Sequence, residues 1–336
     1  LVTDNQFAAI EGLYSAVGTI VSLFGLVTNA ITIKTFVAMG ADDGVTVSFL
    51  CLSSAEFVCF LAFLGQELSM TLWVIEMISG YRIVFFIQPM AFNNFFGNIR
   101  NCLFTIPVLM TVYLSVAKCM CVVKPLHFKN MFPVRRTLWI KAGFCIFAIV
   151  SYVPIFASIG VPELYDGNIN KTRPMLWISP ELDVIKNVVW TTRDSVPCFA
   201  SEVIIIICIY VMSDSLMRAT KFRSSSTSGG MSTGIRGGHL KSGKNIERNT
   251  CQLGGTELQV IKQVVLISVV YIVGNTPKIV VFLAMSVVPD LNIGQRHQNL
   301  AVILANTREL IEMIMSAVNI FIYYEYNSKF RSLCKY

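Results

Sequence analysis

Long uninterrupted apolar runs limit what this chain can fold into more than any other feature of the sequence. A helix needs about 20 apolar residues to cross the hydrocarbon core of a bilayer. The runs cover approximately residues 13–38, 45–73, 91–123, 137–160, 188–217, 256–287 and 299–324. Backbone groups cannot stay unpaired in lipid, so spans are helices or closed barrels, and these runs are too uniformly apolar for alternating barrel strands. The sequence predicts an all-α membrane protein, a seven-transmembrane helix bundle.

The composition agrees with this fold class. Hydrophobic residues make up 54% of the chain and charged residues only 14%, against roughly 25% charged residues in a soluble domain. The ten cysteines lie mostly in apolar runs and form no CxxC pair. We therefore expect small apolar packing residues rather than disulfides or a metal site.

The lysines and arginines predict the orientation. The segments 34–45, 118–141, 214–262 and 325–336 hold 18 of the 27, the opposite loops hold 6, and 3 lie inside spans. Because cytoplasmic loops carry the excess of basic residues, we expect an extracellular N-terminus, a cytoplasmic C-terminus and a plasma-membrane location. Asn170 opens a glycosylation sequon in a loop that this topology places outside.

The predicted seven-span domain covers residues 1–325, with a loop at 223–256 and a tail at 325–336. The loop is basic and rich in Ser and Gly, so we expect disorder and a serine-based regulatory region. The tail predicts a short amphipathic eighth helix. Its Cys334 is either a palmitoylation site or a plain thiol. Basic residues in this tail and in 124–136 suit an anionic lipid leaflet.

Five short motifs occur in order along the spans. They are GLVTNAITI (25–33), LSSAE (52–56), AKCMCVVKPL (117–126), GNTP (274–277) and NIFIY (319–323). Together they resemble the signatures of rhodopsin-like G-protein-coupled receptors, over almost the whole chain. The stretches FGLVTNAITIKTFVAMG, DDGVTVSFL and VNIFIYYEYNSKFR resemble more closely the chemosensory receptors of gastropod molluscs. This resemblance implies a small extracellular ligand, a heterotrimeric G protein, and arrestin and a kinase at the third cytoplasmic loop.

Several departures from the family pattern limit the ligand. Asn93 stands where the family has a cysteine, and residues 161–190 contain none, so we expect no disulfide there and a loop that is ordered otherwise. Met313 replaces the retinal-binding lysine, which argues against light sensing. Arg100 replaces the aspartate of aminergic receptors, which argues against a monoamine.

Ionisable residues inside spans are costly and therefore call for partners or a function. By resemblance, Arg100, Lys278, Glu309 and Glu312 line the ligand cavity. Arginine offers a fork to a carboxylate and lysine a point charge, so a small polar or zwitterionic ligand fits. The alternative is internal pairing, such as Arg100 with Glu312, that only holds helices together.

A second set of residues predicts an activation switch. Arg100 and Lys118 are eighteen residues apart, which is five full helical turns, so they share one face of the third span. Ala117 precedes Lys118, so an acid on the sixth span, Glu257, is its expected partner. Outward movement of the sixth helix at Pro277 would break this pair. The alternative is a lysine that extends to the membrane interface. By resemblance, Asn319 and Tyr323 take part in the same switch.

Asn29, Glu56 and Asn319 are expected to form a buried polar network. The family holds sodium at such a site, and Glu56 keeps the carboxylate. Pro107 stands where a hydroxyl ligand is usual, which favours water over the ion.

Other classes of protein fit less well. The sequence contains no HExxH, GxSxG, P-loop or GxGxxG context, so no enzyme, cofactor or nucleic-acid function is expected. A secondary transporter would favour an internal repeat, and seven spans do not divide into halves. A neuropeptide receptor stays open as the main alternative.

Overall fold

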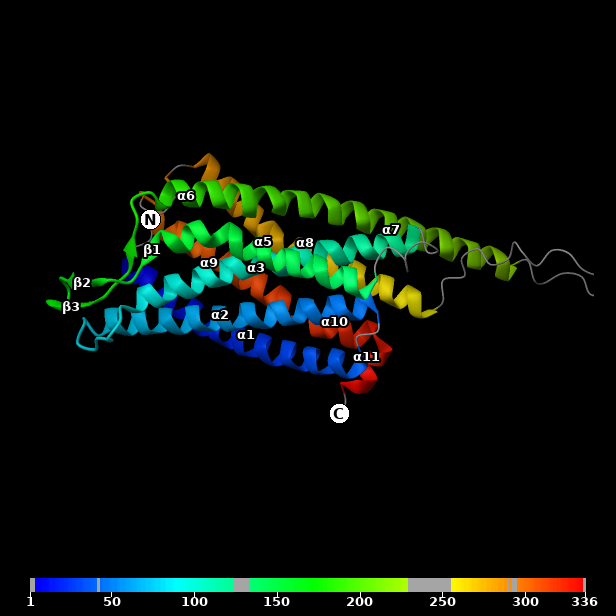
Figure 1. Cartoon of the computed structure of the whole chain (residues 1–336), viewed down its shortest axis with the longest axis horizontal. Helices are drawn as coiled ribbons and strands as arrows, with labels where there is room; N and C mark the ends of the chain where they lie inside the picture. Colours follow the sequence, from blue (N-terminus) through cyan, green and yellow to red (C-terminus); the bar gives the residue numbers. More distant parts are fainter. Residues whose placement is uncertain are drawn as a thin grey trace, which may run out of the picture.

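The computed structural model describes residues 4–40, 43–123, 133–228, 255–288, 290–291 and 295–334. Long helices lie side by side in one elongated bundle (Figure 1). The helices are α1 (Asp4–Met39), α2 (Gly44–Ile78), α3 (Pro89–Val123), α5 (Val134–Ala157), α6 (Leu182–Val189), the π-helical turn η1 (Trp190–Ser195), α7 (Val196–Ser228), α8 (Gly255–Val287), α9 (Gln298–Ala317), α10 (Asn319–Tyr326) and α11 (Ser328–Leu333). The strands are β1 (Ile159–Gly160), β2 (Glu163–Asp166), β3 (Lys171–Pro174) and β4 (Trp177–Ile178).

The predicted seven-helix bundle is confirmed. The fifth span, called the fifth leg below, is one continuous helix through α6, η1 and α7. The seventh span consists of α9 and α10, with a break at Val318. Among the described residues, six helices are long and apolar enough to cross a membrane. The more polar α9 completes the bundle by packing against α1 and α8. The chain is therefore a multi-pass membrane protein.

Both ends of the predicted 223–256 loop differ from expectation. The helix α7 continues through Ser228, and α8 already begins at Gly255. Residues 229–254 lie outside the described part of the chain. The predicted eighth helix corresponds to α11, which Asn327 caps by accepting a bond from the Phe330 N–H at 3.0 Å.

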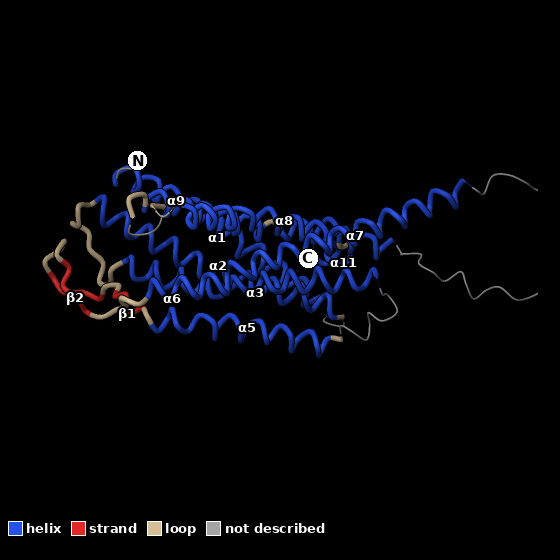
Figure 2. Tube along the Cα trace, turned by 90° about the horizontal axis from the view of Figure 1, so that it is seen from above, coloured by secondary structure: helices blue, strands red, loops and turns tan. Residues whose placement is uncertain are grey.

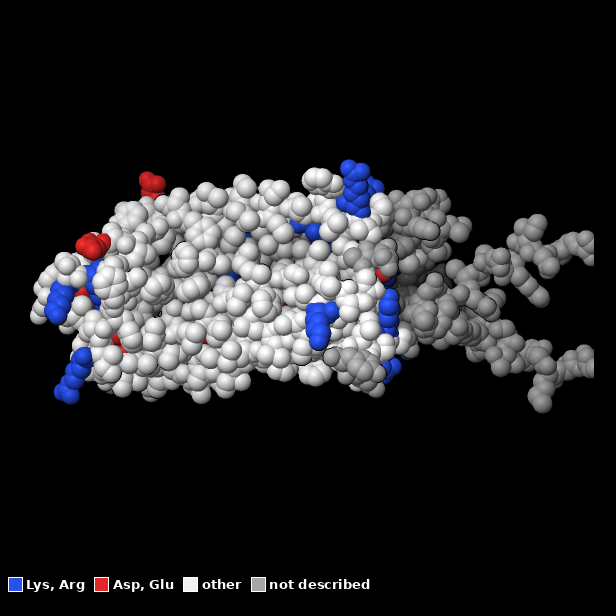
Figure 3. All heavy atoms as spheres, turned by 60° about the horizontal axis from the view of Figure 1, so that its bottom comes forward, with Lys and Arg blue, Asp and Glu red and all other residues white. Residues whose placement is uncertain are grey.

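The two ends of the bundle differ in structure and charge. The four strands gather at the end where the chain begins (Figure 2), and α11 lies at the other end (Figure 1). Lysines and arginines appear toward both ends of the visible face, whereas most of its middle carries no charge (Figure 3). An uncharged middle between charged ends is the surface expected of a bundle that crosses lipid.

Local sequence explains how α1 gives way to α2. Gly40 has φ +85° directly after α1, a conformation that favours glycine and ends helices. Asp43 then caps α2, because its carboxylate accepts the backbone N–H groups of Val45 and Thr46, both at 2.8 Å. Along the pair, a Cβ on Gly25 would lie 2.2 Å from the Phe60 ring, so glycine permits the close approach of α1 to α2.

The loop between α5 and α6 is ordered by a buried ion cluster. Arg173 on β3 donates to Asp166 on β2 at 2.8 Å and to Glu76 at the end of α2 at 2.7 Å. Glu76 also accepts the Phe85 N–H at 2.9 Å, which ties in the connection from α2 to α3. All three charged side chains are buried. The nine cysteines in the described residues are free thiols, so this cluster anchors the hairpin by charge.

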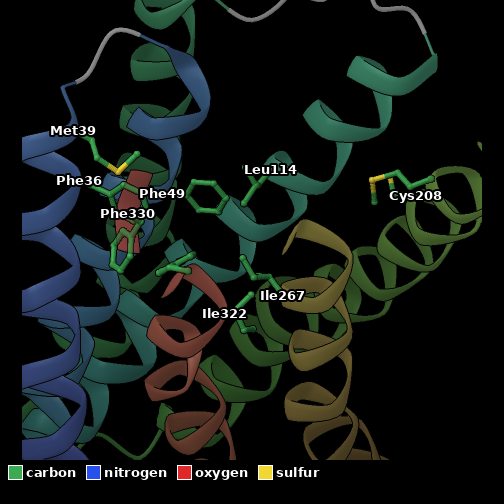
Figure 4. Packing of buried hydrophobic residues seen from close by; sticks show 10 residues of the cluster. Phe36, Met39, Phe49, Leu114, Cys208, Ile267, Ile322 and Phe330 are labelled. Carbon is green, nitrogen blue, oxygen red and sulfur yellow. The ribbon is translucent and has the colours of Figure 1, made fainter. Parts of the chain in front are cut away.

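Aromatic packing joins four helices at the end of the bundle where α11 lies. Phe36 of α1 lies 5.6 Å from Phe49 of α2 and 5.1 Å from Phe330 of α11, between ring centroids. Figure 4 shows these three rings grouped together, with Leu114 of α3 beside them. Tyr323 of α10 completes the group, 5.2 Å from Phe49. This aromatic cluster holds α10 and α11 against the bundle.

Removing the charge of Arg173 should destabilise the outer end of the protein. Arg173→Met leaves Glu76 and Asp166 buried without a cation, which should cost roughly 3 kcal/mol, the lower end for breaking a buried pair. Lys171→Met is the matched control, because Lys171 is exposed on the same strand. Thermal unfolding of the detergent-solubilised chain measures both. Equal melting temperatures for the two variants would contradict the anchoring role.

The same cluster sets a pH dependence. Burial raises the pKa of Asp166, but the Asn168 N–H and the Arg173 guanidinium outweigh burial and hold this pKa below its ordinary 3.8. A carboxyl with a lowered pKa contributes stability that is present above its unfolded pKa and is lost as the pH falls through the folded value. The difference in stability between wild type and Arg173→Met should therefore shrink below about pH 4.

Candidate functional site

A cavity of about 300 Å³ lies in the half of the bundle that carries the strands. Side chains from α2, α3, the α6–η1–α7 leg, α8 and α9 line it. The four residues predicted for the ligand site, Arg100, Lys278, Glu309 and Glu312, all belong to this lining. The structure thus brings together charges that are up to 212 residues apart in the sequence (100 to 312).

Arg100 forms hydrogen bonds and an ion pair inside the bundle. Its Nε donates to Oε1 of Gln66 at 3.0 Å, and its Nη2 donates to Asn101 at 2.9 Å and pairs with Glu309. Glu309 also accepts from Gln66 at 3.2 Å and pairs with Arg308 at 3.3 Å. Internal pairing of Arg100 therefore does occur, but with Glu309, one turn from the Glu312 named in the sequence-based alternative. This pair joins α2, α3 and α9.

Lys278 and Glu312 differ from that pair. Neither takes part in an ion pair among the described residues. The Nζ of Lys278 lies 5.6 Å from the centroid of the Phe104 ring, within the range of a cation–π contact. Oε1 of Glu312 is buried without a hydrogen-bond partner in the described residues. A buried charge such as Glu312 normally requires a counterpart, and Glu312 and the partly buried Lys278 present opposite charges to the cavity.

Sequence reasoning missed Arg193. It was counted with the outer-loop residues, yet its guanidinium is buried within the fifth leg. Its Nη2 donates to the carbonyl oxygens of Asn101 and Cys102 and, at 2.6 Å, to the Thr105 hydroxyl, all on α3. The π-helical turn η1 positions it, and such turns are frequent at functional sites. Its place inside the predicted span 188–217 was the available signal.

A smaller cavity of about 50 Å³ lies deeper in the bundle. It is lined by Glu56 and Asn319, which are joined by a 2.8 Å hydrogen bond from Asn319 to Glu56. The third predicted member, Asn29, is buried but donates to the Gly25 carbonyl of its own helix. Glu312, Phe104 and Val108 line both cavities. Among the described residues, no group of three His, Cys, Asp or Glu is arranged for a metal ion.

The described residues include only some side chains of the predicted activation switch. Lys118 is buried, and the Glu257 side chain lies outside the described residues. Asp43, an anion that the sequence analysis did not consider, lies near Lys118. Burial raises the pKa of Asp43, but hydrogen bonds from Thr46 and Val45, together with the charge of Lys118, lower this pKa overall. Pro277 lies within α8, one residue before Lys278. Tyr323 is enclosed by the aromatic cluster.

Two predicted modification residues occupy accessible places. Asn170 is exposed at the tip of the β2–β3 hairpin with φ +53°, and its Oδ1 accepts from Tyr165 at 3.0 Å. Cys334 caps the C-terminus of α11 and is partly exposed. Both positions are compatible with the modifications predicted for them.

Comparisons with known proteins identify the fold. No protein-family model matches the chain, and no curated protein matches its sequence. Solved structures do match, and they define the class of architecture as a rhodopsin-like seven-helix bundle. Among them, squid rhodopsin has a TM-score of 0.61 and 14% sequence identity, over 97% of this chain and 84% of that one. At this identity the likeness establishes the fold.

Breaking the Arg100–Glu309 pair should test whether it holds the bundle. Arg100→Met leaves Glu309 with Arg308 alone and should lower stability by roughly 3–5 kcal/mol, the range for a buried pair that loses one partner. The double variant Arg100→Met, Glu309→Met removes both buried charges and should recover much of the loss. Thermal unfolding in detergent measures this. A single variant as stable as the wild type would contradict the pairing.

Proposed function

We propose that this protein is a G-protein-coupled receptor, the simplest function consistent with a rhodopsin-like bundle that carries a charged outer cavity.

 It detects a small polar or zwitterionic extracellular ligand and passes the signal to a heterotrimeric G protein. One observation supports this most directly: Lys278 and Glu312 present opposite charges, outside any ion pair of the described residues, in a cavity of about 300 Å³. A cavity at the small end of the usual range favours a small molecule over a neuropeptide.

Within this proposal, the four predicted ligand residues divide into two pairs. Arg100 and Glu309 bind each other and shape the wall of the cavity. Lys278 binds the carboxylate of the ligand, and Glu312 binds its ammonium group. The chemosensory role and the binding of arrestin and a kinase at 223–256 rest on the sequence resemblance. The extracellular N-terminus and the plasma-membrane location rest on the distribution of basic residues, and glycosylation at Asn170 rests on its sequon.

The proposed activation of the receptor follows from the position of Lys278. It lies next to Pro277 on α8, and proline removes a backbone hydrogen bond and weakens the helix there. A ligand that draws Lys278 toward Glu312 on α9 favours one bend of α8 over another, because a ligand shifts an equilibrium only by its differential affinity for the two states. The inner end of α8 then moves outward, separates Glu257 from Lys118 and opens the G-protein site.

Removing either open charge should weaken the response to a zwitterionic ligand. Lys278→Met and Glu312→Gln each delete one charge-assisted hydrogen bond, worth roughly 1.5–3 kcal/mol, so potency should fall about 10- to 100-fold. Arg82→Met is the control, because Arg82 is exposed outside the spans. G-protein activation in cells, normalised to surface expression, measures the effect. Unchanged potency in both variants would exclude this ligand site.

The inner lock gives a separate test. Glu257→Ala removes the proposed partner of Lys118. An ion pair at the water-exposed end of a helix bundle is worth roughly 0.5–1 kcal/mol, so ligand-free signalling should rise about two- to fivefold. The charge exchange Lys118→Glu, Glu257→Lys should return it toward the wild-type level. Basal G-protein activation is the readout, and a basal level that Glu257→Ala leaves unchanged would remove the lock.

A further inference from the structure

We propose that the outer cavity takes an α-amino acid with an apolar side chain, bound with its ammonium and carboxylate groups at the cavity floor and its side chain toward the mouth. This inference rests on the proposed function and narrows its ligand class. It follows from the order in which charged and apolar residues line the cavity.

The two open charges lie at the floor. Glu312 and Phe104 line both the outer cavity and the deeper one, so they mark the boundary between the two. Lys278 lies 5.6 Å from the Phe104 ring and therefore belongs to the same level. Lys278 and Glu312 form no ion pair with each other in the described structure. A ligand group that carries both charges at one end can bind between them.

The walls above the floor are apolar on α8 and small on α9. Lys278, Phe282 and Met285 follow one face of α8 at i, i+4 and i+7, and Met285 lies about 10 Å of helix rise above Lys278. On α9, Ala305 lies seven residues before Glu312, which is again about 10 Å. The helices α8 and α9 pack against each other. Phe282 and Met285 thus share their level with Ala305.

Several other polar groups of the lining bind protein partners. Asn98 accepts from the Tyr152 hydroxyl at 2.9 Å and donates to Asn94 at 2.7 Å. Asn101 accepts from Arg100, and Arg193 donates to oxygens of α3. These bonds leave the floor as the place for a charged ligand group.

Energetics then select the ligand class. A ligand with one charge would leave either Lys278 or the buried Glu312 without a counterpart in the filled cavity, which is costly for Glu312 above all, whereas a zwitterion satisfies both. Between Phe282, Met285 and Ala305, a polar or charged side chain would exchange much of its water for apolar neighbours, which is unfavourable. An aliphatic, aromatic or thioether side chain gains from burial in the same place.

The test compares amino acids on the full chain expressed in cells, with G-protein activation as the readout. The probes are glycine, alanine, leucine, methionine, phenylalanine, aspartate and lysine, together with the N-acetyl and amide forms of leucine and phenylalanine. We expect leucine, methionine or phenylalanine to be about 10-fold or more potent than glycine, aspartate and lysine. Blocking either end of the zwitterion should cost about 10-fold or more.

Filling the space above the floor gives the decisive variant. Ala305→Leu should raise the half-maximal concentration of leucine and phenylalanine about 10-fold and leave that of glycine and alanine within about twofold. Ala142→Leu adds the same side chain at an exposed position of α5 and should change neither. Equal potency for all side chains, or an equal shift for all ligands in Ala305→Leu, would overturn the proposed orientation.

A binding measurement separates this inference from the proposed function. The melting temperature of the purified full chain should rise with millimolar leucine or phenylalanine and stay constant with their N-acetyl forms. Stabilisation without G-protein activation would retain the ligand class and reject the receptor function. Activation by a compound that is not a zwitterion, with neither stabilisation nor activation by any amino acid, would reject the ligand class and retain the receptor.

Discussion

A charge inside a membrane-spanning helix must find a counterpart, and this constraint organises the part of the molecule around the larger cavity. Water is absent from the hydrocarbon core, so an isolated Arg100 would be costly there. Its pairing with Glu309, supported by Gln66, removes that cost and at the same time fixes α2, α3 and α9 relative to one another. The cavity beside this pair is therefore bounded by a rigid wall. Lys278 on α8 and Glu312 on α9 line the same cavity but take no part in the Arg100–Glu309 pair.

The same principle acts outside the membrane, where it orders the loop between α5 and α6. Arg173 joins the hairpin to the end of α2 through Glu76, and Gln88 accepts the Leu176 N–H at 3.1 Å near the start of α3. The hairpin is thus tied at both sides of the connection from α2 to α3. Because this loop leads directly into α6 and η1, its attachment also limits where Arg193 enters the bundle.

Features of single helices could be predicted from the sequence more fully than contacts between helices. Run lengths predicted the spans and the all-α class. The resemblance to rhodopsin-like receptors placed four ionisable residues of the spans around one cavity, and all four do line one. Partner choice was not predictable: Glu309 and Glu312 are one turn apart, and the rotation of α9 decides which of them meets Arg100. Helix rotation also explains Asn29, which is buried but bonds to its own helix. The Arg173 cluster joins strands that the apolar pattern did not indicate.

In the proposed receptor, the signal from the cavity to the end of the bundle near α11 would pass through weak rather than strong contacts. Glu312 borders both cavities, so a ligand that neutralises it also changes the environment of the Glu56–Asn319 pair below. Farther in, Tyr323 is held by aromatic packing, with contacts worth about 0.5–1.5 kcal/mol each beyond burial, and Lys118 lies near the charge of Asp43. A shift from a mostly closed to a mostly open state needs about 5.5 kcal/mol of differential binding. Two charge-assisted contacts of roughly 1.5–3 kcal/mol each reach this order only if the proposed ligand makes both of them in the open state alone.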